Sequence, residues 1–363
     1  MRALVAAGGT AGHVLPALAL ARTLADGGDD VRFLGTPGGQ EVGLVAAAGF
    51  PFVAVDARPV PRRAPARAAA AVLADLRAVG ACRGHAREAD VVVGMGGYAS
   101  VPAGLAASLV GTPLVLHEQN AIPGLANRLL ARRADVVALS FPEAAARLGR
   151  GVATRVTGNP VRSAVRDAAR ERAGDGAQAA RSRAASALGL DPDRPTLVVF
   201  GGSLGAARIN GALAAAADLL GGTQVLLLAG TAHADALRRT LPAAVRVEGF
   251  LDRMEFAYAV ADVVVARAGA TTCAEVALCG IPAILVPYPH ATAGHQEANA
   301  RALEVAGAVE VVMDDRLDGD ALATRVIGLL GDRARRDAMA AAGRAWARPD
   351  AAEALATLVR SVA

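Results

Sequence analysis

The stretch that decides the fold is ADVVVARAGATTCAEVALCGIPAILVPYPHATAGHQEAN, which covers residues 261–299. Its apolar runs at 263–266 and 282–287 predict two buried strands, and the segment from Thr271 to Gly280 predicts a helix between them. Two parallel strands that flank one helix end at the same edge of a sheet. Because open α/β sheets bind ligands at that edge, we expect a binding site here.

Residues at the start of the predicted helix suit a ligand that carries an anionic group and a sugar. Gly269 lets a ligand approach the backbone, and the helix start offers N–H groups to an anion. Glu275, one turn further on, can reach the hydroxyls of a sugar. Thr272 and Glu275 also have the T-x-x-E spacing of a capping box, so a structural role for Glu275 is a second interpretation.

The loop after the second predicted strand carries His290, His295 and Gln296. Two histidines could suggest a metal site, but no third ligand lies at helical spacing. We therefore expect this loop to contact a polar ligand and not a metal.

Length and composition set the broad class. A chain of 363 residues is long for one domain, so we expect two. No apolar run reaches the roughly 18 to 20 residues of a membrane-spanning helix, and the first residues lack the apolar run of a signal peptide, so we expect a cytosolic protein. Cys82, Cys273 and Cys279 show no metal-ligand spacing and are expected to be buried thiols. The net charge of +4 suits nucleic acid, an anionic membrane or phosphorylated substrates equally.

Strands and helices alternate along the chain, which predicts an α/β fold with parallel sheets covered by helices on both faces. The plan of strand, glycine turn and helix begins at residue 2 and again at residue 196. With a break near Pro160, we expect one domain at 1–160 and another at 161–345, followed by a last helix. The charged segment 167–186 shows no apolar stripe and is predicted to be a solvated helix or a mobile insertion.

Three glycine clusters follow predicted strands, at 8–12, 94–97 and 201–205. Tight turns need glycine for packing alone, but three such turns favour phosphate binding. A dinucleotide is a poor candidate for the ligand. The turns at 8–12 and 201–205 do not read GxGxxG, and the acidic residue that would hold a ribose after the second strand of each half is missing.

Two groups of polar residues are candidates for chemistry. His13 follows the first glycine turn at a helix start, which lowers the pKa of an imidazole and favours a neutral base; a polar helix cap is the equal alternative. His117, Glu118, Gln119 and Asn120 follow an apolar strand. Strand-end loops of this kind usually carry function, although Asn120 could serve only as a turn residue.

Motifs along almost the whole chain resemble one family. They read GGTAGHVLPALALA, GMGGYASVPAGLAA, LHEQNAIPGLANRLLA, GNPVR, GGSLGAARIN and RAGATTCAEVALCGIPAILVPYPH. The chain resembles the MurG family, the UDP-N-acetylglucosamine–N-acetylmuramyl-(pentapeptide) pyrophosphoryl-undecaprenol N-acetylglucosamine transferases of glycosyltransferase family 28. The resemblance implies a GT-B fold of two Rossmann-like, doubly wound parallel-sheet domains that face a cleft. It also implies that the C-terminal helix, 346–363, packs back on the first domain.

The resemblance further implies a reaction and its partners. N-acetylglucosamine (GlcNAc) passes with inversion from UDP-GlcNAc to the C4 hydroxyl of the muramyl sugar in lipid I, giving lipid II for peptidoglycan synthesis. Neither a metal or other cofactor nor a nucleic acid is expected, and the protein is expected to be peripheral on the cytoplasmic side of the cell membrane. Two alternatives stay open: a transferase of the same fold that acts on another lipid or a natural product, and a UDP-GlcNAc 2-epimerase.

The resemblance assigns roles to matching residues. His13 is the implied general base, assisted by Tyr98, His117 and Glu118. Ser203 and Arg162 would meet the diphosphate, Glu275 the ribose, Leu251 the uracil, and Asn120 and Gln296 the GlcNAc. The full implied donor set is Thr10, Gly12, His13, Asn120, Arg162, Ser203, Leu251, Ala270, Thr271, Thr272, Glu275 and Gln296. The glycines that would hold the acceptor's pyrophosphate are Gly9, Gly12, Gly96 and Gly97. Ala11 and Leu204 depart from the glycine and glutamine that are usual in the family.

The segment 58–87 mixes arginine with apolar residues. We expect it to lie on the anionic inner leaflet, with an ordinary amphipathic surface helix as the alternative. The arginines and apolar residues concerned are Arg62, Arg63, Arg67, Arg77, Arg83, Val60, Val72, Leu73, Leu76 and Val79.

Overall fold

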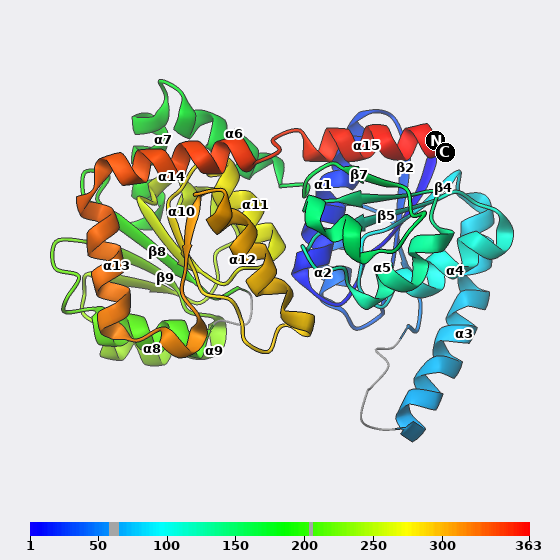
Figure 1. Ribbon diagram of the computed structural model, residues 1–363, viewed down its shortest axis with the longest axis horizontal. Helices are drawn as coiled ribbons and strands as arrows, with labels where there is room; N and C mark the ends of the chain where they lie inside the picture. The colour runs from blue at the N-terminus through cyan, green and yellow to red at the C-terminus, as the bar shows by residue number, and fades with distance from the viewer. Residues whose placement is uncertain (58–64, 203–205) are drawn as a thin grey trace. The chain divides into compact units, whose positions relative to one another are not determined.

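The structure, a computed structural model, describes residues 1–57, 65–202 and 206–363 (Figure 1). The chain forms two compact units. The first consists of Met1–Arg162 and Asp350–Ala363, and the second of Ser163–Pro349. The first unit thus ends two residues after the boundary expected at 160, and it includes the last helix. Among the described helices, none has the length and apolar character needed to span a bilayer.

The first unit is built on a seven-stranded parallel sheet in the order β3-β2-β1-β4-β5-β6-β7. Its strands are β1 (Arg2–Ala6), β2 (Asp30–Gly35), β3 (Phe52–Ala54), β4 (Val91–Gly94), β5 (Leu114–Glu118), β6 (Val136–Leu139) and β7 (Thr154–Val156). Its helices are α1 (Ala11–Asp26), α2 (Gln40–Ala47), α3 (Pro65–Glu88), α4 (Ser100–Val110), α5 (Leu125–Leu130) and α15 (Ala351–Val362), with short 3-10 helices η1 (Ala131–Arg133) and η2 (Pro142–Arg147).

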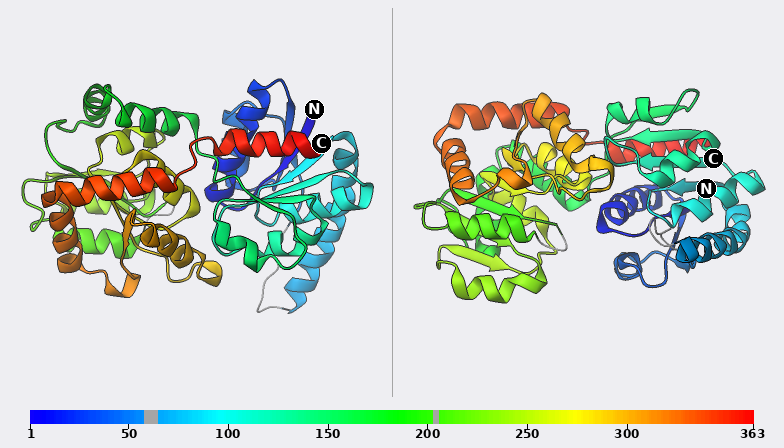
Figure 2. Two further views of the ribbon diagram at one scale, coloured as in Figure 1. Left: turned by 45° about the horizontal axis from the view of Figure 1, so that its top comes forward. Right: turned by 60° about the horizontal axis from the view of Figure 1, so that its bottom comes forward.

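Both faces of this sheet are covered because successive strand residues point to opposite sides and both sets are apolar. Val5 and Val93 belong to the core under α1, α2 and α15. Leu4 and Val92 belong to the core under α3, α4 and α5. In Figures 1 and 2 the red α15 lies beside the blue α1, as their contacts require. The strand order reverses between β1 and β4, so the ligand-binding switch point of this sheet lies there.

The second unit is built on a six-stranded parallel sheet in the order β10-β9-β8-β11-β12-β13. Its strands are β8 (Thr196–Phe200), β9 (Gln224–Leu228), β10 (Val245–Glu248), β11 (Val263–Ala266), β12 (Ala283–Leu285) and β13 (Val309–Val311). Its helices are α6 (Ser163–Ala173), α7 (Ala177–Leu188), α8 (Ala207–Ala216), α9 (Thr231–Thr240), α10 (Met254–Val260), α11 (Ala270–Cys279), α12 (His295–Val305), α13 (Gly319–Gly331) and α14 (Arg333–Trp346), with 3-10 helices η3 (Thr292–Gly294) and η4 (Asp314–Arg316).

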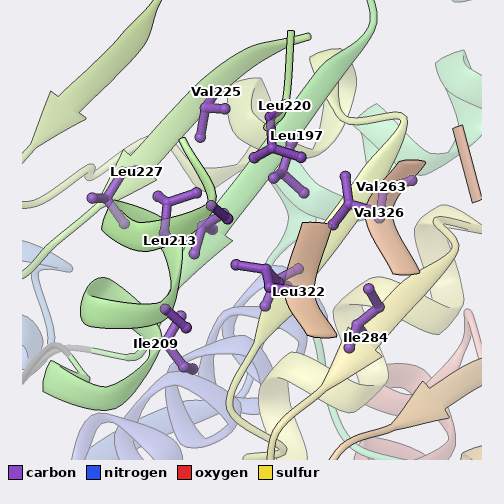
Figure 3. Close-up of a cluster of buried hydrophobic side chains, with 14 of the residues drawn as sticks. Leu197, Ile209, Leu213, Leu220, Val225, Leu227, Val263, Ile284, Leu322 and Val326 are labelled. Carbon is purple, nitrogen blue, oxygen red and sulfur yellow. The ribbon is translucent and has the colours of Figure 1, made fainter. Parts of the chain in front are cut away.

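One face of the second sheet packs under α8, α9 and α13, where Leu197, Leu213 and Leu322 meet in the core drawn in Figure 3. On the other face, α10 packs against α6 and α7, and α11 packs against α6. The strand order reverses between β8 and β11. The deciding stretch, 261–299, therefore supplies one side of the second switch point.

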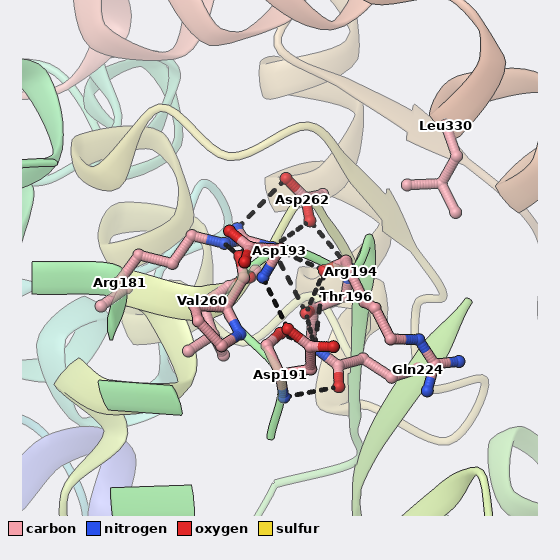
Figure 4. A network of polar contacts seen from close by, with 12 residues as sticks. Arg181, Asp191, Asp193, Arg194, Thr196, Gln224, Val260, Asp262 and Leu330 are labelled. Carbon is pink, nitrogen blue, oxygen red and sulfur yellow. Dashed lines mark hydrogen bonds and ion pairs between the residues drawn. The ribbon is translucent and has the colours of Figure 1, made fainter. Parts of the chain in front are cut away.

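Residues 167–186 are helical, as one of the two alternatives had it, and form most of α6 and α7; the alternative of a mobile insertion was wrong, as was the expectation that no apolar stripe is buried. Their buried stripe consists of alanines such as Ala169 and Ala184, which carry too little hydrophobicity to stand out among charged residues. Arg181 of α7 pairs with Asp262 at 2.8 Å and donates to the carbonyl oxygens of Pro192, Val260 and Arg194 (Figure 4). Arg181 thus helps to hold the unit together.

Two local expectations also need correction. The N-cap of α11 is Gly269 and Thr272 is the third residue of the helix, so Thr272 and Glu275 do not form a capping box. His295 and Gln296 open α12 and do not lie in a loop. The positive φ of 70° at Gly294 ends the preceding turn and lets α12 begin one residue later.

Candidate active site

Two glycine turns meet at the switch point of the first unit. They follow β1 and β4, and a Cβ on Gly97 would lie only 2.0 Å from the carbonyl oxygen of Gly8. Gly9 and Gly96 adopt φ values of 96° and 91°, which favour glycine. Ser100 donates its hydroxyl to the carbonyl oxygens of Ala6 and Gly96, at 3.0 and 2.8 Å, and so ties the second turn to β1. The result is a backbone-lined surface that a phosphate can approach closely.

His13 lies beside these turns, in the first turn of α1 after the N-cap Thr10. Its Nδ1 is 3.3 Å from Oε1 of Gln119, and Nε2 of Gln119 donates to the carbonyl oxygen of Met95 at 2.7 Å. Gln119 is 1% exposed. No role was predicted for Gln119, and its only signal in the sequence was its place among the polar residues 117–120.

His117 lies in the interior at the end of β5. Its side chain is 0% exposed, and its Nε2 donates to the carbonyl oxygen of Gly158 at 3.0 Å. Burial lowers the pKa of His117 from 6.5 to about 4; the bond to Gly158 raises it and the nearby charge of His13 lowers it. The ring is therefore neutral at pH 7, and it holds the end of β5 against residue 158.

Glu118 shapes the loop that carries Asn120. Its Oε1 accepts from the backbone N and the side-chain Nδ2 of Asn120, at 3.0 and 3.3 Å. Its Oε2 accepts from Gly124 N at 2.9 Å and Asn127 Nδ2 at 2.8 Å. With four donors and 1% exposure, this carboxylate positions the loop. Tyr98 is half-buried, and a Cβ on Gly9 would lie 3.2 Å from its ring.

The switch point of the second unit is the N-terminus of α11. Gly269 precedes the helix in an extended conformation, and Ala270, Thr271 and Thr272 form the first turn. The first N–H groups of a helix have no partner within it, and they carry the positive end of the helix dipole. Thr271 also has a buried Oγ1 without a hydrogen-bond partner among the described residues. This end of the helix suits a phosphate.

Three further polar side chains belong to α11 and to the helix α12 that packs against it. Glu275 is 4% exposed, and its Oε2 accepts the hydroxyl of Tyr258 at 2.8 Å. Gln296 in α12 accepts the backbone N–H of Tyr288 through Oε1 at 2.9 Å. Asn299 donates to the carbonyl oxygen of Ala268 at 3.2 Å and joins α12 to the turn before α11.

The predicted site residues are divided between the two units. The first unit holds Gly9, Thr10, Gly12, His13, Gly96, Gly97, Tyr98, His117, Glu118, Asn120 and Arg162, and the second holds Leu251, Ala270, Thr271, Thr272, Glu275 and Gln296. Ser203 and Leu204 lie outside the described residues. His295 uses Nδ1 to bond the carbonyl oxygen of Thr292 at 2.8 Å. Over the described parts of the chain, no three or more histidine, cysteine, aspartate or glutamate side chains group as metal ligands would.

Each half of the chain matches one domain of a known protein family. Residues 3–139 match the glycosyltransferase family 28 N-terminal domain, and residues 196–355 match the glycosyltransferase family 28 C-terminal domain. The chain belongs to glycosyltransferase family 28. This family 28 chain is a glycosyltransferase with a GT-B fold, so the fold class and the resemblance predicted from the motifs are confirmed.

Named relatives of this family 28 enzyme match over its full length. The UDP-N-acetylglucosamine–N-acetylmuramyl-(pentapeptide) pyrophosphoryl-undecaprenol N-acetylglucosamine transferase of Moorella thermoacetica is 40% identical over 375 aligned positions, covering 99% of this chain and 98% of that protein. The protein of the same name from Nocardioides sp. is 43% identical and covers 99% and 97%. The crystal structure of Acinetobacter baumannii MurG matches with a TM-score of 0.77 at 30% identity over 99% of both chains. A putative UDP-N-acetylglucosamine 2-epimerase from Listeria monocytogenes reaches 0.69 at 15% identity, with 99% and 96% covered, which shows the fold alone.

Proposed function

We propose that this family 28 enzyme transfers GlcNAc from UDP-GlcNAc, with inversion, to the C4 hydroxyl of the muramyl-pentapeptide in lipid I, forming lipid II. The observation that carries the proposal is the full-length match, at 40% identity and above, to transferases named for this reaction. The polar groups at both switch points support it, since they supply a base in one unit and an anion site in the other.

In the proposed reaction, Nε2 of His13 takes the proton of the acceptor hydroxyl as that oxygen bonds to the anomeric carbon of GlcNAc. The bond from this carbon to the β-phosphate oxygen breaks, and its electron pair leaves with UDP. A positioned base of this kind contributes about 10² to 10⁴ in rate. His117 and Glu118 are poor substitutes because both are buried and hold the surrounding backbone. We therefore assign them, with Tyr98, to shaping the site.

The charge that develops on UDP needs a partner, and we assign it to the first turn of α11 and to Arg162. Helix N-terminal N–H groups and an arginine stabilise a departing phosphate without a metal. We place the diphosphate against Ala270, Thr271, Thr272 and Ser203, and the ribose on Glu275. Leu251 meets the uracil, Asn120 and Gln296 meet the GlcNAc, and Thr10 belongs to the same donor site.

The acceptor's pyrophosphate is assigned to the glycine turns of the first unit. The residues assigned are Gly9, Gly12, Gly96 and Gly97. Gly12 is exposed and Gly9 and Gly97 are half-buried, and the absence of side-chain carbons there permits close approach of an anion, while the buried Gly96 shapes the turn. The two turns follow the neighbouring strands β1 and β4, and the first turn leads into α1. A pyrophosphate bound at the turns therefore lies within reach of His13 on α1.

The deciding experiment measures UDP release from UDP-GlcNAc with and without a short-chain lipid I analogue. We expect release to require the acceptor, to persist in EDTA, and to fall by about 10² or more in His13→Ala. The matched control is His233→Ala, which removes an exposed histidine on α9 and leaves the rate unchanged. Conversion of UDP-GlcNAc without acceptor would replace the proposal by an epimerase, and transfer only to other acceptors would replace it by another transferase.

A lipid acceptor requires contact with a membrane, and we propose that the first unit provides it at the cytoplasmic face. Of the basic segment predicted for this role, Val60, Arg62 and Arg63 lie outside the described residues, as do the side chains of Arg67, Val72 and Leu73. Of the remainder, Val79 is buried, while Leu76 is 61% exposed beside the exposed Arg77.

A second set of exposed residues supports the same surface. Leu125 and Leu129 of α5 are 57% and 54% exposed, and the exposed Arg128 and Arg132 interleave with them at helical spacing. α5 packs against α4, which packs against α3, so these helices cover one face of the same sheet. Leucines that enter a bilayer and arginines that meet anionic headgroups are the two parts of a peripheral membrane site.

Vesicle binding tests this surface. Arg128→Glu with Arg132→Glu should lower partitioning onto phosphatidylglycerol vesicles at least about tenfold, because each basic residue contributes about 1 kcal/mol near an anionic surface. The control, Arg194→Glu with Arg239→Glu in the second unit, should bind as wild type. If the Arg128/Arg132 double variant bound these vesicles as well as the Arg194/Arg239 control does, this face would be ruled out as the membrane site.

A further inference from the structure

The side-chain amide of Gln119 can face only one way. Its Nε2 donates to the carbonyl oxygen of Met95 at 2.7 Å, and a carbonyl oxygen accepts but never donates. The amide oxygen Oε1 is thereby turned toward Nδ1 of His13, at 3.3 Å. Since this oxygen cannot donate either, the shared proton belongs to Nδ1 of His13.

The backbone around this contact leaves room for nothing larger than glycine. A Cβ on Gly96 would lie 2.8 Å from Nδ1 of His13 and 3.3 Å from Oε1 of Gln119. Ser100 holds the carbonyl oxygen of Gly96, so the turn keeps its place against the two side chains. A glycine at position 96 is therefore required twice: for the positive φ of the turn and for the space that the His13–Gln119 pair occupies.

From this arrangement we propose that Gln119 is a positioning residue that fixes the tautomer of His13. With the proton on Nδ1, the neutral ring has Nε2 as its acceptor nitrogen, which is the atom that the transfer reaction requires. The inference rests on the proposed function, in which His13 takes the proton of the acceptor hydroxyl. When Nε2 receives that proton the ring becomes a cation, and its bond to Gln119 becomes charge-assisted and stronger.

The neutrality of Gln119 has its own consequence. A carboxylate in the same place would also hold Nδ1–H, but it would raise the pKa of His13 and leave less free base at neutral pH. The titratable groups on the neighbouring elements are His117 and Glu118 at the end of β5, Tyr98 after β4 and Glu41 at the start of α2. His117 is neutral around pH 7, and Glu118 is hydrogen-bonded to the loop at 120–124.

Nitrogen NMR of the imidazole rings tests the tautomer directly in the wild-type protein. The chain has six histidines, and the His13 signals are assigned by their loss in His13→Ala. We expect a protonated, pyrrole-type Nδ1 and an unprotonated Nε2 at pH 8, and a mixture of tautomers in Gln119→Leu. A protonated Nε2 in the wild type would overturn the inference without any need for a variant to fold.

Kinetics test the consequence. Gln119→Leu should lower kcat about tenfold or more with little change in KM for UDP-GlcNAc. Gln119→Glu should keep more activity than Gln119→Leu at high pH and shift the acidic limb of the pH–rate profile upward by about one unit. Wild-type kcat and pH profile in both variants, alongside an inactive His13→Ala, would overturn the role of Gln119 alone. An active His13→Ala would overturn the proposed base and this inference together.

Discussion

Glu275 is oriented in part by a buried neighbour, since Tyr258 donates its hydroxyl to Oε2 at 2.8 Å. Tyr258→Phe removes this donor and keeps the ring, which makes a T-shaped contact with Phe200 at a centroid distance of 6.2 Å. With Glu275 on the ribose, as proposed, we expect UDP to bind about tenfold more weakly or worse, since a hydrogen bond to a charged group contributes about 1.5–3 kcal/mol. Calorimetry with UDP measures the change. The control ligand is 2′,3′-dideoxy-UDP, which should bind both proteins alike; equal losses for both nucleotides would place the effect away from the ribose.

His117 makes folding sensitive to acid. Its pKa falls from 6.5 to about 4 on folding, so between these values the unfolded chain binds a proton that the folded protein does not. Stability therefore rises with pH in this window: the contribution is complete above pH 6.5 and is lost toward pH 4, by about 3 kcal/mol. His117→Gln, which keeps a donor for Gly158, should flatten the dependence in urea unfolding at pH 4 to 7. The control, His233→Gln at an exposed position, should keep the wild-type pH dependence of the unfolding free energy. If His117→Gln kept it too, the stability change would not come from His117.

At the scale of elements, strands of branched apolar residues were predictable because burial on both faces leaves continuous runs, as at Val263–Ala266. The buried faces of α6 and α7 were not, because alanine stripes contribute little to an apolar pattern. The turn at Gly269 predicted the start of α11 closely, but it could not show that Tyr258, 17 residues earlier, would contact Glu275. The 117–120 cluster was recognised as polar, whereas the bond from Gln119 to Met95 depends on how β4 and β5 pair.

Arg181 offers a test of how α7 is attached. Arg181→Leu leaves Asp262 and the carbonyl oxygens of Pro192 and Val260 without this donor at the amino ends of β8 and β11 (Figure 4). We expect a loss of about 2 kcal/mol or more in unfolding free energy, because partly buried charged groups lose their partner. Acceptor-dependent activity should persist at 25 °C, since the opposite edge of the sheet carries the proposed site. Arg183→Leu, which breaks the exposed pair with Glu171, should cost less than about 0.5 kcal/mol. Similar losses in both variants would contradict a special role for Arg181.

At the scale of the whole molecule, one plan occurs twice. Each sheet reverses its strand order beside its first strand, at β1 and β4 in one unit and at β8 and β11 in the other. Repetition of strand, glycine turn and helix made this plan visible in the sequence. The return of the chain to the first unit at Asp350 was implied by the family resemblance alone, because an amphipathic helix at a chain end can cover any apolar face.

That return makes the first unit depend on the far end of the chain. Leu355 and Val359 of α15 are fully buried in its core, and Arg360 pairs with Asp29 at 2.8 Å. Leu355→Ala should destabilise the first unit by about 2–5 kcal/mol through the cavity it leaves. Hydrogen exchange should then show lower protection in β1 and unchanged protection in β8. Leu322→Ala, equally buried in α13, should produce the reverse pattern. If either substitution lowered protection equally in both strands, the two units would unfold as one, and α15 would stabilise the whole chain and not the first unit alone.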